Sequence, residues 1–133
     1  MVRKTYLLIF VVLLLSACNV QSSEDVEEEE YATSNPTAEE ILSSSPDADI
    51  FMTEDIIYTY AEDIDWVMEL DLTLGEEVTE ITNQTNNSSE FKNGTATELP
   101  VGTKIYKPNE KRGAIYIAIV DGKEIRYIGL IEG

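Results

Sequence analysis

A pattern in the last third of the chain restricts the fold most strongly. Residues 114–120 (AIYIAIV) are apolar at every position, which is typical of a strand that is covered on both faces. Asp121-Gly122 follows and favours a two-residue type I′ turn, so we expect residues 123–131 to return as the second strand of a hairpin. The register of that turn places four side chains on one face, which we expect to be core: Tyr116, Ala118, Ile125 and Tyr127.

Shorter strand and turn signals recur upstream of this hairpin. Each combines an alternating or β-branched run with Gly, Pro or Asn at its end. We expect a type I turn at Leu99–Gly102 with Pro100 second, a strand at 103–106, a type I′ turn at Asn93-Gly94 between short strands at 91–92 and 95–96, and strands at 70–74 and 78–81 separated by Gly75-Glu76.

The segment over residues 50–68 fits two periodicities. Its apolar residues alternate as in a strand, and they also recur every three or four positions as in a helix. We favour a hairpin from Ile50 to Tyr60 that turns at Thr53–Asp55, followed by a turn or short helix at Ala61–Asp65.

Together these signals predict a mainly β domain over residues 50–133. About seven short strands, with turns roughly every ten residues and at most one short helix, suggest a small barrel or sandwich, with an α+β fold as the alternative. The chain has one Cys, so no disulfide within it can stabilise this domain. A domain of this size therefore needs a well-packed core.

Residues 18–49 have a different composition. From Asn19 to Asp49 there are ten acidic residues and no basic one, with Ser and Pro filling much of the remainder. Such a segment buries too little apolar area to offset the entropy of ordering, so we expect an acidic disordered tether. Within it, Thr37 and Glu40 have the spacing of a helix capping box, which predicts a short helix at 37–42.

The first seventeen residues have the organisation of a signal peptide. Arg3 and Lys4 precede an apolar run over residues 6–15, and two small residues follow. Ten residues of helix span only about 15 Å, roughly half of a hydrocarbon core, so the run is too short for a membrane-spanning helix.

Leu15-Ser16-Ala17-Cys18 resembles the lipobox of bacterial lipoproteins, and all four positions fit. The resemblance implies that a diacylglyceryl group is attached to the Cys18 thiol and that residues 1–17, the lipoprotein signal peptide, are removed. It also implies a lipid anchor that holds the protein to the outer, extracytoplasmic face of the cell membrane, and it implies nothing about the fold of the remainder.

The body of the chain is similar to small uncharacterised lipoproteins of Bacillus-type Gram-positive bacteria. The similarity lies in residues 99–106 (LPVGTKIY) and in the closing residues 127–133. These stretches are patterns that relate to the fold and not to any chemistry, and the resemblance implies no active site.

Composition excludes several classes of chemistry. The chain has no His and one Cys, so a Ser-His-Asp triad, a Cys-His pair and a Cys-rich zinc site are all excluded. A net charge of −17 argues against nucleic acid as a partner. From these exclusions we expect no catalytic residue and no cofactor. We also expect no metal site, since Asp63-Ile-Asp65 begins like a calcium loop but departs from it at the later ligand positions.

Three hypotheses for function follow. The first is a non-enzymatic binding or interaction module, anchored in the membrane through Cys18, whose partner is a protein or the cell wall and whose candidate interaction surface comprises Trp66, Tyr58 and Tyr60. The second is a carboxylate-dependent hydrolase of cell-wall glycans that uses Asp63 and Asp65. The third is an acidic structural or cation-binding surface protein.

Overall fold

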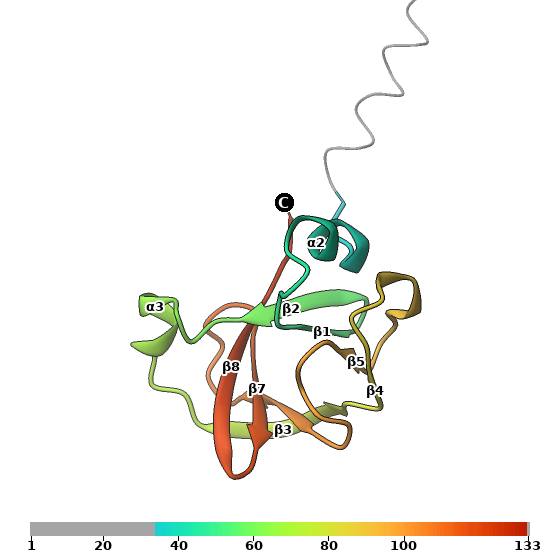
Figure 1. Ribbon diagram of the computed structural model, residues 1–133. Helices are drawn as coiled ribbons and strands as arrows, with labels where there is room; N and C mark the ends of the chain where they lie inside the picture. Colours follow the sequence, from blue (N-terminus) through green and yellow to red (C-terminus); the bar gives the residue numbers. More distant parts are fainter. Residues whose placement is uncertain (1–33, 133) are drawn as a thin grey trace, which may run out of the picture. The chain divides into compact units, whose positions relative to one another are not determined.

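The computed structural model describes residues 34–132, and a compact unit begins at Asn35. The expected mainly β class is confirmed, because eight strands form one curled half-barrel sheet in the order β3-β6-β7-β8-β2-β1-β5-β4 (Figure 1). The strands are β1 (Ile50–Thr53), β2 (Ile56–Tyr60), β3 (Leu74–Glu80), β4 (Asn83–Gln84), β5 (Thr95–Ala96), β6 (Lys104–Pro108), β7 (Ile115–Val120) and β8 (Lys123–Gly129). The helices are α2 (Ala38–Ser44), α3 (Asp65–Met68) and the 3₁₀ helix η2 (Ser88–Glu90).

The β7–β8 hairpin forms with the register that its sequence predicts. Asp121 and Gly122 have φ values of 51° and 79°, as a type I′ turn requires. Tyr116 lies opposite Tyr127 and Ala118 opposite Ile125. The face that carries these four side chains belongs to the core, and β7 is covered on its other face as well, where Ile115 and Ile117 are buried.

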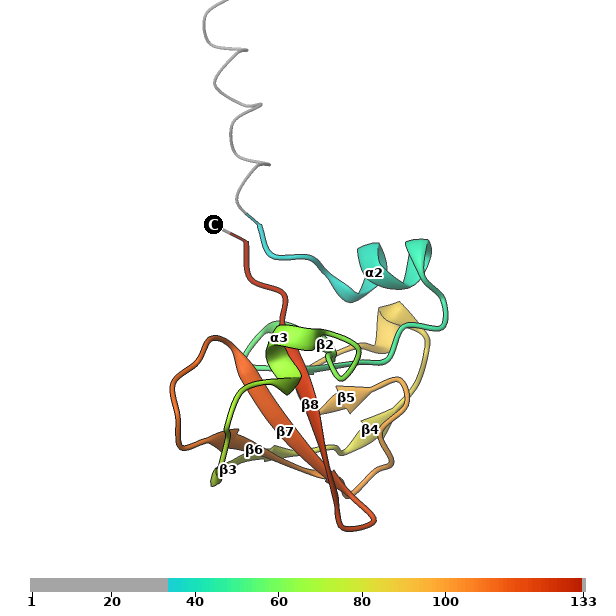
Figure 2. The ribbon, with the colours of Figure 1, turned by 90° about the vertical axis from the view of Figure 1, so that its left-hand side faces the viewer.

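Both edges of the sheet belong to one stretch of chain. β3 and β4 are the outermost strands of the sheet order, and only two residues separate them in the sequence (Figure 2). One of the two, Ile81, is fully buried, and its backbone N–H donates to the carbonyl of Thr103 beside β6. The next residue, Thr82, donates its N–H to the carbonyl of Gly94 beside β5. The hydrogen bonds of Ile81 and Thr82 thus join this linking segment to the chain beside β6 and beside β5, near the two edges of the curled sheet.

Four aromatic rings fill the inside of the curled sheet. Phe51 stacks on Tyr58 with ring centroids 5.2 Å apart, and Tyr58 stacks on Tyr116 at 4.6 Å. Tyr127 contacts Phe51 edge-on at 5.0 Å. These rings come from β1, β2, β7 and β8, so the cluster joins both central hairpins.

Order begins well before Ile50, so the expected tether boundary at residue 49 is wrong. Thr37 caps helix α2 with the predicted capping box, in which the Thr37 hydroxyl accepts from the N–H of Glu40 while the Glu40 carboxylate accepts from the N–H of Thr37. Its apolar residues Ala38 and Leu42 pack on Ile50 and Ile57, a contact that acidic composition alone could not reveal. Residues 18–33 of the expected tether, and the expected signal peptide, lie outside the described residues.

The hairpin favoured for residues 50–60 is confirmed. β1 pairs with β2 in antiparallel fashion, and Phe51 lies opposite Tyr58. The turn consists of Glu54 and Asp55, both with positive φ. The short helix that follows is α3, which begins at Asp65, where we expected it to end.

Three of the other sequence expectations are wrong in detail. Of the Asn93-Gly94 pair, only Gly94 has a positive φ, and residues 91–92 form no strand. In the later turn, Thr103 donates its N–H to Pro100, so proline is first and not second. β3 begins at Leu74 and runs through Gly75, where a Cβ would lie 2.6 Å from the Lys107 carbonyl oxygen. Glycine thus permits close approach of β6 here, where the sequence suggested a break.

The packing of α2 can be tested with Leu42→Ala. Leu42 is 8% exposed against the sheet, so the substitution should lower the free energy of unfolding by about 2 kcal/mol in urea denaturation. Ser43→Ala, on the exposed side of the same helix, should change it by less than about 0.5 kcal/mol. Equal stability of the two variants would show that α2 does not pack on the sheet.

Candidate functional site

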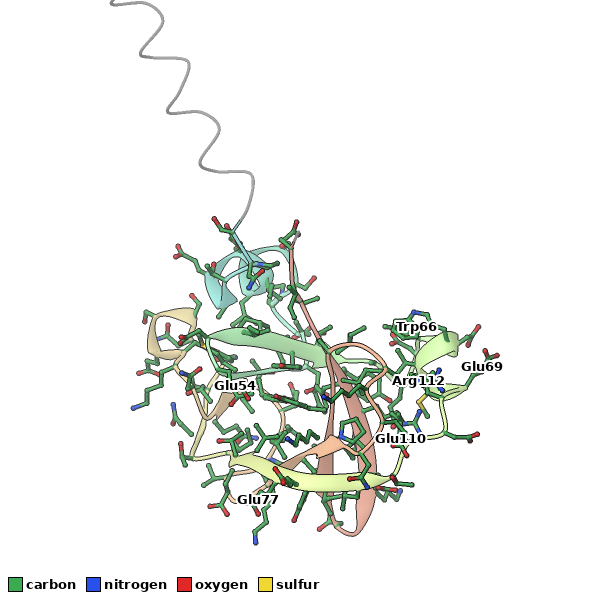
Figure 3. The ribbon with its side chains drawn as sticks, turned by 180° about the vertical axis from the view of Figure 1, so that it is seen from behind. Glu54, Trp66, Glu69, Glu77, Glu110 and Arg112 are labelled. Carbon is green, nitrogen blue, oxygen red and sulfur yellow. The ribbon has the colours of Figure 1, made fainter. Side chains whose placement is uncertain are left out.

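The most exposed large aromatic side chain of the described residues lies on α3. Trp66, which is labelled in Figure 3, projects from α3. Trp66 is 51% exposed and Met68 is 43% exposed, whereas Val67 between them is fully buried. Val67 packs with Ala61 and Ile115, which fixes α3 on the outer face of β7. Trp66 and Met68 therefore flank the attachment point and face solvent. Exposure of the apolar Trp side chain to water is unfavourable, and such side chains are enriched at binding sites.

Carboxylates are concentrated on the same segment as these two apolar side chains. The segment 61–73 carries five acidic residues and no basic one: Glu62, Asp63, Asp65, Glu69 and Asp71. All but Glu62, which is partly buried, are exposed. We call Trp66, Met68 and these five acids the α3 surface. The α3 surface therefore carries exposed apolar side chains and exposed carboxylates on one short segment.

Arg126 holds the α3 segment from beneath. Its guanidinium donates to the carbonyl oxygens of Val67 and Leu70, the latter at 2.9 Å, and so places a cation at the C-terminal end of the short helix, where it is favourable. The Arg126 backbone N–H donates to the Glu62 carboxylate at 3.2 Å. The helix is therefore fixed in position without the use of its exposed carboxylates.

Thr73 fastens the other end of this segment to the loop after β6. Its N–H and its hydroxyl donate to the Glu110 carboxylate at 2.7 Å and 2.8 Å. Asn109 donates its side-chain amide to the Thr73 hydroxyl at 2.9 Å and its backbone N–H to the Thr73 carbonyl, also at 2.9 Å. The bonds from the Thr73 N–H and then from its hydroxyl lower the pKa of Glu110 below its ordinary value of 4.5.

The three aromatic residues expected to form one interaction surface do not lie together. Tyr58 is 3% exposed and belongs to the inner cluster, so its assignment to a surface is wrong. Tyr60 is exposed but contacts Tyr127 of that inner cluster, with ring centroids 6.2 Å apart. Trp66 lies on α3, on the other face of the sheet. Of the three, only Trp66 belongs to the α3 surface.

Asp63 and Asp65, the candidate acid pair, are both exposed on the α3 segment. Asp63 lies in the turn before α3 and Asp65 is the first residue of the helix, so they do not share a strand face as a pair two residues apart in a strand would. Neither carboxylate lines any of the cavities described below. In the part of the chain that the structure describes, no group of three or more Asp, Glu, Cys or His is placed to hold a metal ion.

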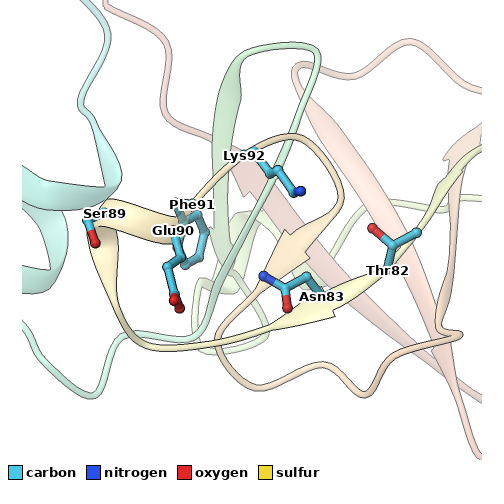
Figure 4. Close-up of a pocket in the computed structure, with 6 residues that line it drawn as sticks. All are labelled: Thr82, Asn83, Ser89, Glu90, Phe91 and Lys92. Atoms are coloured by element: carbon cyan, nitrogen blue, oxygen red, sulfur yellow. The ribbon is translucent and has the colours of Figure 1, made fainter.

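A cavity of about 730 Å³ lies between β4 and the loop that carries η2 (Figure 4). Its lining residues are Thr82, Asn83, Ser89, Glu90, Phe91 and Lys92. The Glu90 carboxylate accepts a hydrogen bond from the Thr85 hydroxyl at 3.0 Å. This is a wide, shallow site, and its charged groups do not converge on one point.

A second cavity of about 520 Å³ lies where the 107–113 loop meets Tyr58 and Tyr116. The Tyr116 hydroxyl donates to the Glu54 carboxylate at 2.9 Å. Burial, and then this bond, raise the pKa of Tyr116, so it remains a neutral donor at physiological pH. Three of the other charged groups of the lining have partners, since Glu76 pairs with Lys107 at 3.3 Å and Glu110 is held by Thr73.

Sequence analysis missed the Glu54-Asp55 turn as a point of strain. Both residues have positive φ, 52° and 63°, a conformation that is unfavourable for Glu54, whereas Asp55 is of a type that adopts it more readily. Two contacts from distant parts of the chain hold them. Asp55 exchanges hydrogen bonds with Asn93 at 2.9 Å and 3.1 Å, and Glu54 accepts from Tyr116. The pairing partners are 38 and 62 residues away, so no local signal could have identified them.

Comparisons with known proteins leave the function to be argued from this geometry. No protein-family model, curated protein or solved structure matches the chain. The similarity to Bacillus-type lipoproteins therefore stays a prediction. Across residues 34–132, none of the helices has the length and apolar character needed to cross a membrane.

The connection at Thr73 can be tested by titration. Thr73→Val removes the hydroxyl that Glu110 and Asn109 share, so the Glu110 pKa should rise toward its ordinary value. Because the folded-state pKa is lowered, the carboxylate stabilises the loop above pH 4.5, and this contribution is lost as pH falls below that value. NMR titration of the Glu110 carboxyl group in the native protein and in Thr73→Val measures the change in its pKa.

Thr79→Val, on β3, serves as the matched control and should leave the titration of Glu110 unchanged. A Glu110 that titrates identically in the native protein and in Thr73→Val would contradict the assignment.

Proposed function

We propose that this protein is a lipoprotein, anchored at the outer face of the cell membrane through a diacylglyceryl group on Cys18, and that it acts there as a non-enzymatic interaction module. The observation that carries the anchor is the order of residues at the start of the chain: basic residues, a ten-residue apolar run and then Leu15-Ser16-Ala17-Cys18. A diacylglyceryl group inserts two acyl chains, and two chains give stable anchoring where one is marginal.

The distance from the anchor to the folded unit is compatible with display at the membrane. Seventeen positions separate Cys18 from Asn35, where the compact unit begins. Even fully extended, this length of chain spans at most about 60 Å. On this proposal the unit stays close to the bilayer, within reach of other membrane and cell-wall components.

The α3 surface supports the interaction role. Trp66 and Met68 expose apolar area on a segment that Arg126 and Thr73 hold in one position. A rigid surface loses little entropy on binding, which favours affinity. The alternative hydrolase would need two carboxylates facing one another in a cleft. Asp63 and Asp65, the pair considered for it, lie on the exposed α3 segment, and no specific observation favours that alternative.

The anchor is tested by Cys18→Ala. Without the thiol no diacylglyceryl group can be attached, so we expect the protein in the culture medium or retained as an unprocessed precursor. Cell fractionation with mass spectrometry of the product distinguishes these forms from the native one. A Cys18→Ala protein that stays in the membrane at its normal mature mass would disprove lipidation.

A further inference from the structure

We infer that the α3 surface is a docking site for a basic segment of another extracytoplasmic protein, one that carries Lys or Arg beside at least one apolar side chain. This inference rests on the proposed interaction role and specifies the chemistry of the partner. Three properties of the described residues carry it: the exposed Trp66, the charge around it, and the way in which the segment is held.

The charge around Trp66 selects the sign of the partner. The segment 61–73 contributes five carboxylates and no base. One cation lies beneath the segment, because the Arg126 guanidinium is bonded to α3 carbonyl groups. Arg112 lies on the same side of the molecule as Trp66 and Glu69 (Figure 3). Arg112 offsets part of the charge of the five carboxylates, and the carboxylates still outnumber it. The remaining negative charge would attract Lys and Arg side chains, which steer association and fix the register of a partner.

The exposed apolar side chains favour a partner that has apolar residues as well as basic ones. Trp66 is half exposed, and an indole ring offers both apolar contact and a face for a Lys or Arg cation. Met68 is an adaptable side chain that suits a surface able to accept different apolar groups. A basic segment with one or two apolar residues would match both components.

Two other occupants are less compatible with the charges. Residues 34–132 carry seven Lys and Arg against twenty Asp and Glu, a net charge of −13, so a second copy of this chain would be repelled. An anionic lipid surface would be repelled for the same reason. Each of these occupants is an outcome that the experiment can detect.

The experiment uses the mature lipidated protein in a neutral detergent. Trp66 is the single Trp of the chain, so its fluorescence reports directly on the proposed site. The probe is a synthetic Lys- and Arg-rich peptide with one Leu pair and no Trp, and the control peptide has Glu at every basic position. We expect the basic peptide to shift the Trp66 emission to shorter wavelength, and raised salt to weaken its binding. The acidic peptide should have no effect.

Two triple variants locate the site. Asp63→Asn with Glu69→Gln and Asp71→Asn removes three carboxylates from the α3 surface and should lower the affinity for the basic peptide about tenfold. Glu76→Gln with Glu77→Gln and Glu80→Gln removes three from β3 and should change the affinity by less than about twofold. Equal losses in both variants would show a diffuse acidic surface and overturn the inference.

Three further results would also overturn the inference. They are binding of the acidic peptide with equal affinity, binding of the basic peptide without a change in Trp66 emission, and a shift in Trp66 emission on addition of anionic phosphatidylglycerol vesicles alone. The anchor is tested separately by Cys18→Ala. If Cys18 is lipidated and the peptide does not bind, the proposed partner is wrong and the anchor stands. If Cys18 is unmodified and the peptide binds at Trp66, the anchor is wrong and the partner stands.

Discussion

The aromatic cluster inside the curled sheet is the interaction on which the rest of the structure depends. Each of its four rings comes from a different strand, and the rings pack in contact at 4.6–5.2 Å between centroids. Two of its hydroxyl groups also reach outward. Tyr116 donates to Glu54 in the β1–β2 turn, and Tyr127 donates to Asp49, before β1, at 2.8 Å. Burial raises the pKa of Tyr127, and the bonded Asp49 raises it further, so the hydroxyl remains a donor.

These hydrogen bonds extend the influence of the core into the acidic part of the chain. Asp49 belongs to the segment that composition alone describes as a tether, yet its carboxylate accepts a hydrogen bond from the hydroxyl of Tyr127, a buried residue. Its neighbours on α2 add a layer of apolar contacts over β1 and β2. The core therefore orders about fifteen residues whose composition opposes ordering, and a boundary drawn from composition falls too late in the sequence.

The parts of the fold that the sequence predicts are those with local causes. Asp121-Gly122 and the alternating side chains beside it determine the register of β7–β8 within a few residues. The capping box of α2 is likewise a contact between residues three apart. By contrast, the path through Gly75 depends on the approach of Lys107, which is 32 positions further along the chain. A glycine in a sequence does not reveal whether it ends a strand or makes room for another one.

The same distinction applies to the candidate site. Trp66, Tyr58 and Tyr60 look alike in sequence, since each is an aromatic residue in a mixed polar and apolar segment. Tyr58 and Tyr60 share one face of β2, but Tyr58 lies within the aromatic cluster and Tyr60, the last residue of the strand, is more exposed. Trp66 is exposed because α3 presents its flanks to solvent. The contacts that hold the α3 segment in place were even harder to predict from the sequence. Arg126 and Glu110 reach the α3 segment from 59 and 37 positions away, and neither stands out by residue type.

The acidic surface does little to stabilise the fold, and this bears on its purpose. In the part of the chain that the structure describes, the ion pairs are Lys104–Glu77 and Lys107–Glu76, both exposed and both between β3 and β6. Exposed pairs of this kind contribute little, and the exposed carboxylates of the α3 surface take part in neither. A net charge of −13 on these residues opposes compaction through self-repulsion. The exposed carboxylates that lie on the same firmly held segment as the half-exposed Trp66 therefore add little to stability, and this is part of the basis on which we propose that the α3 surface binds a basic partner.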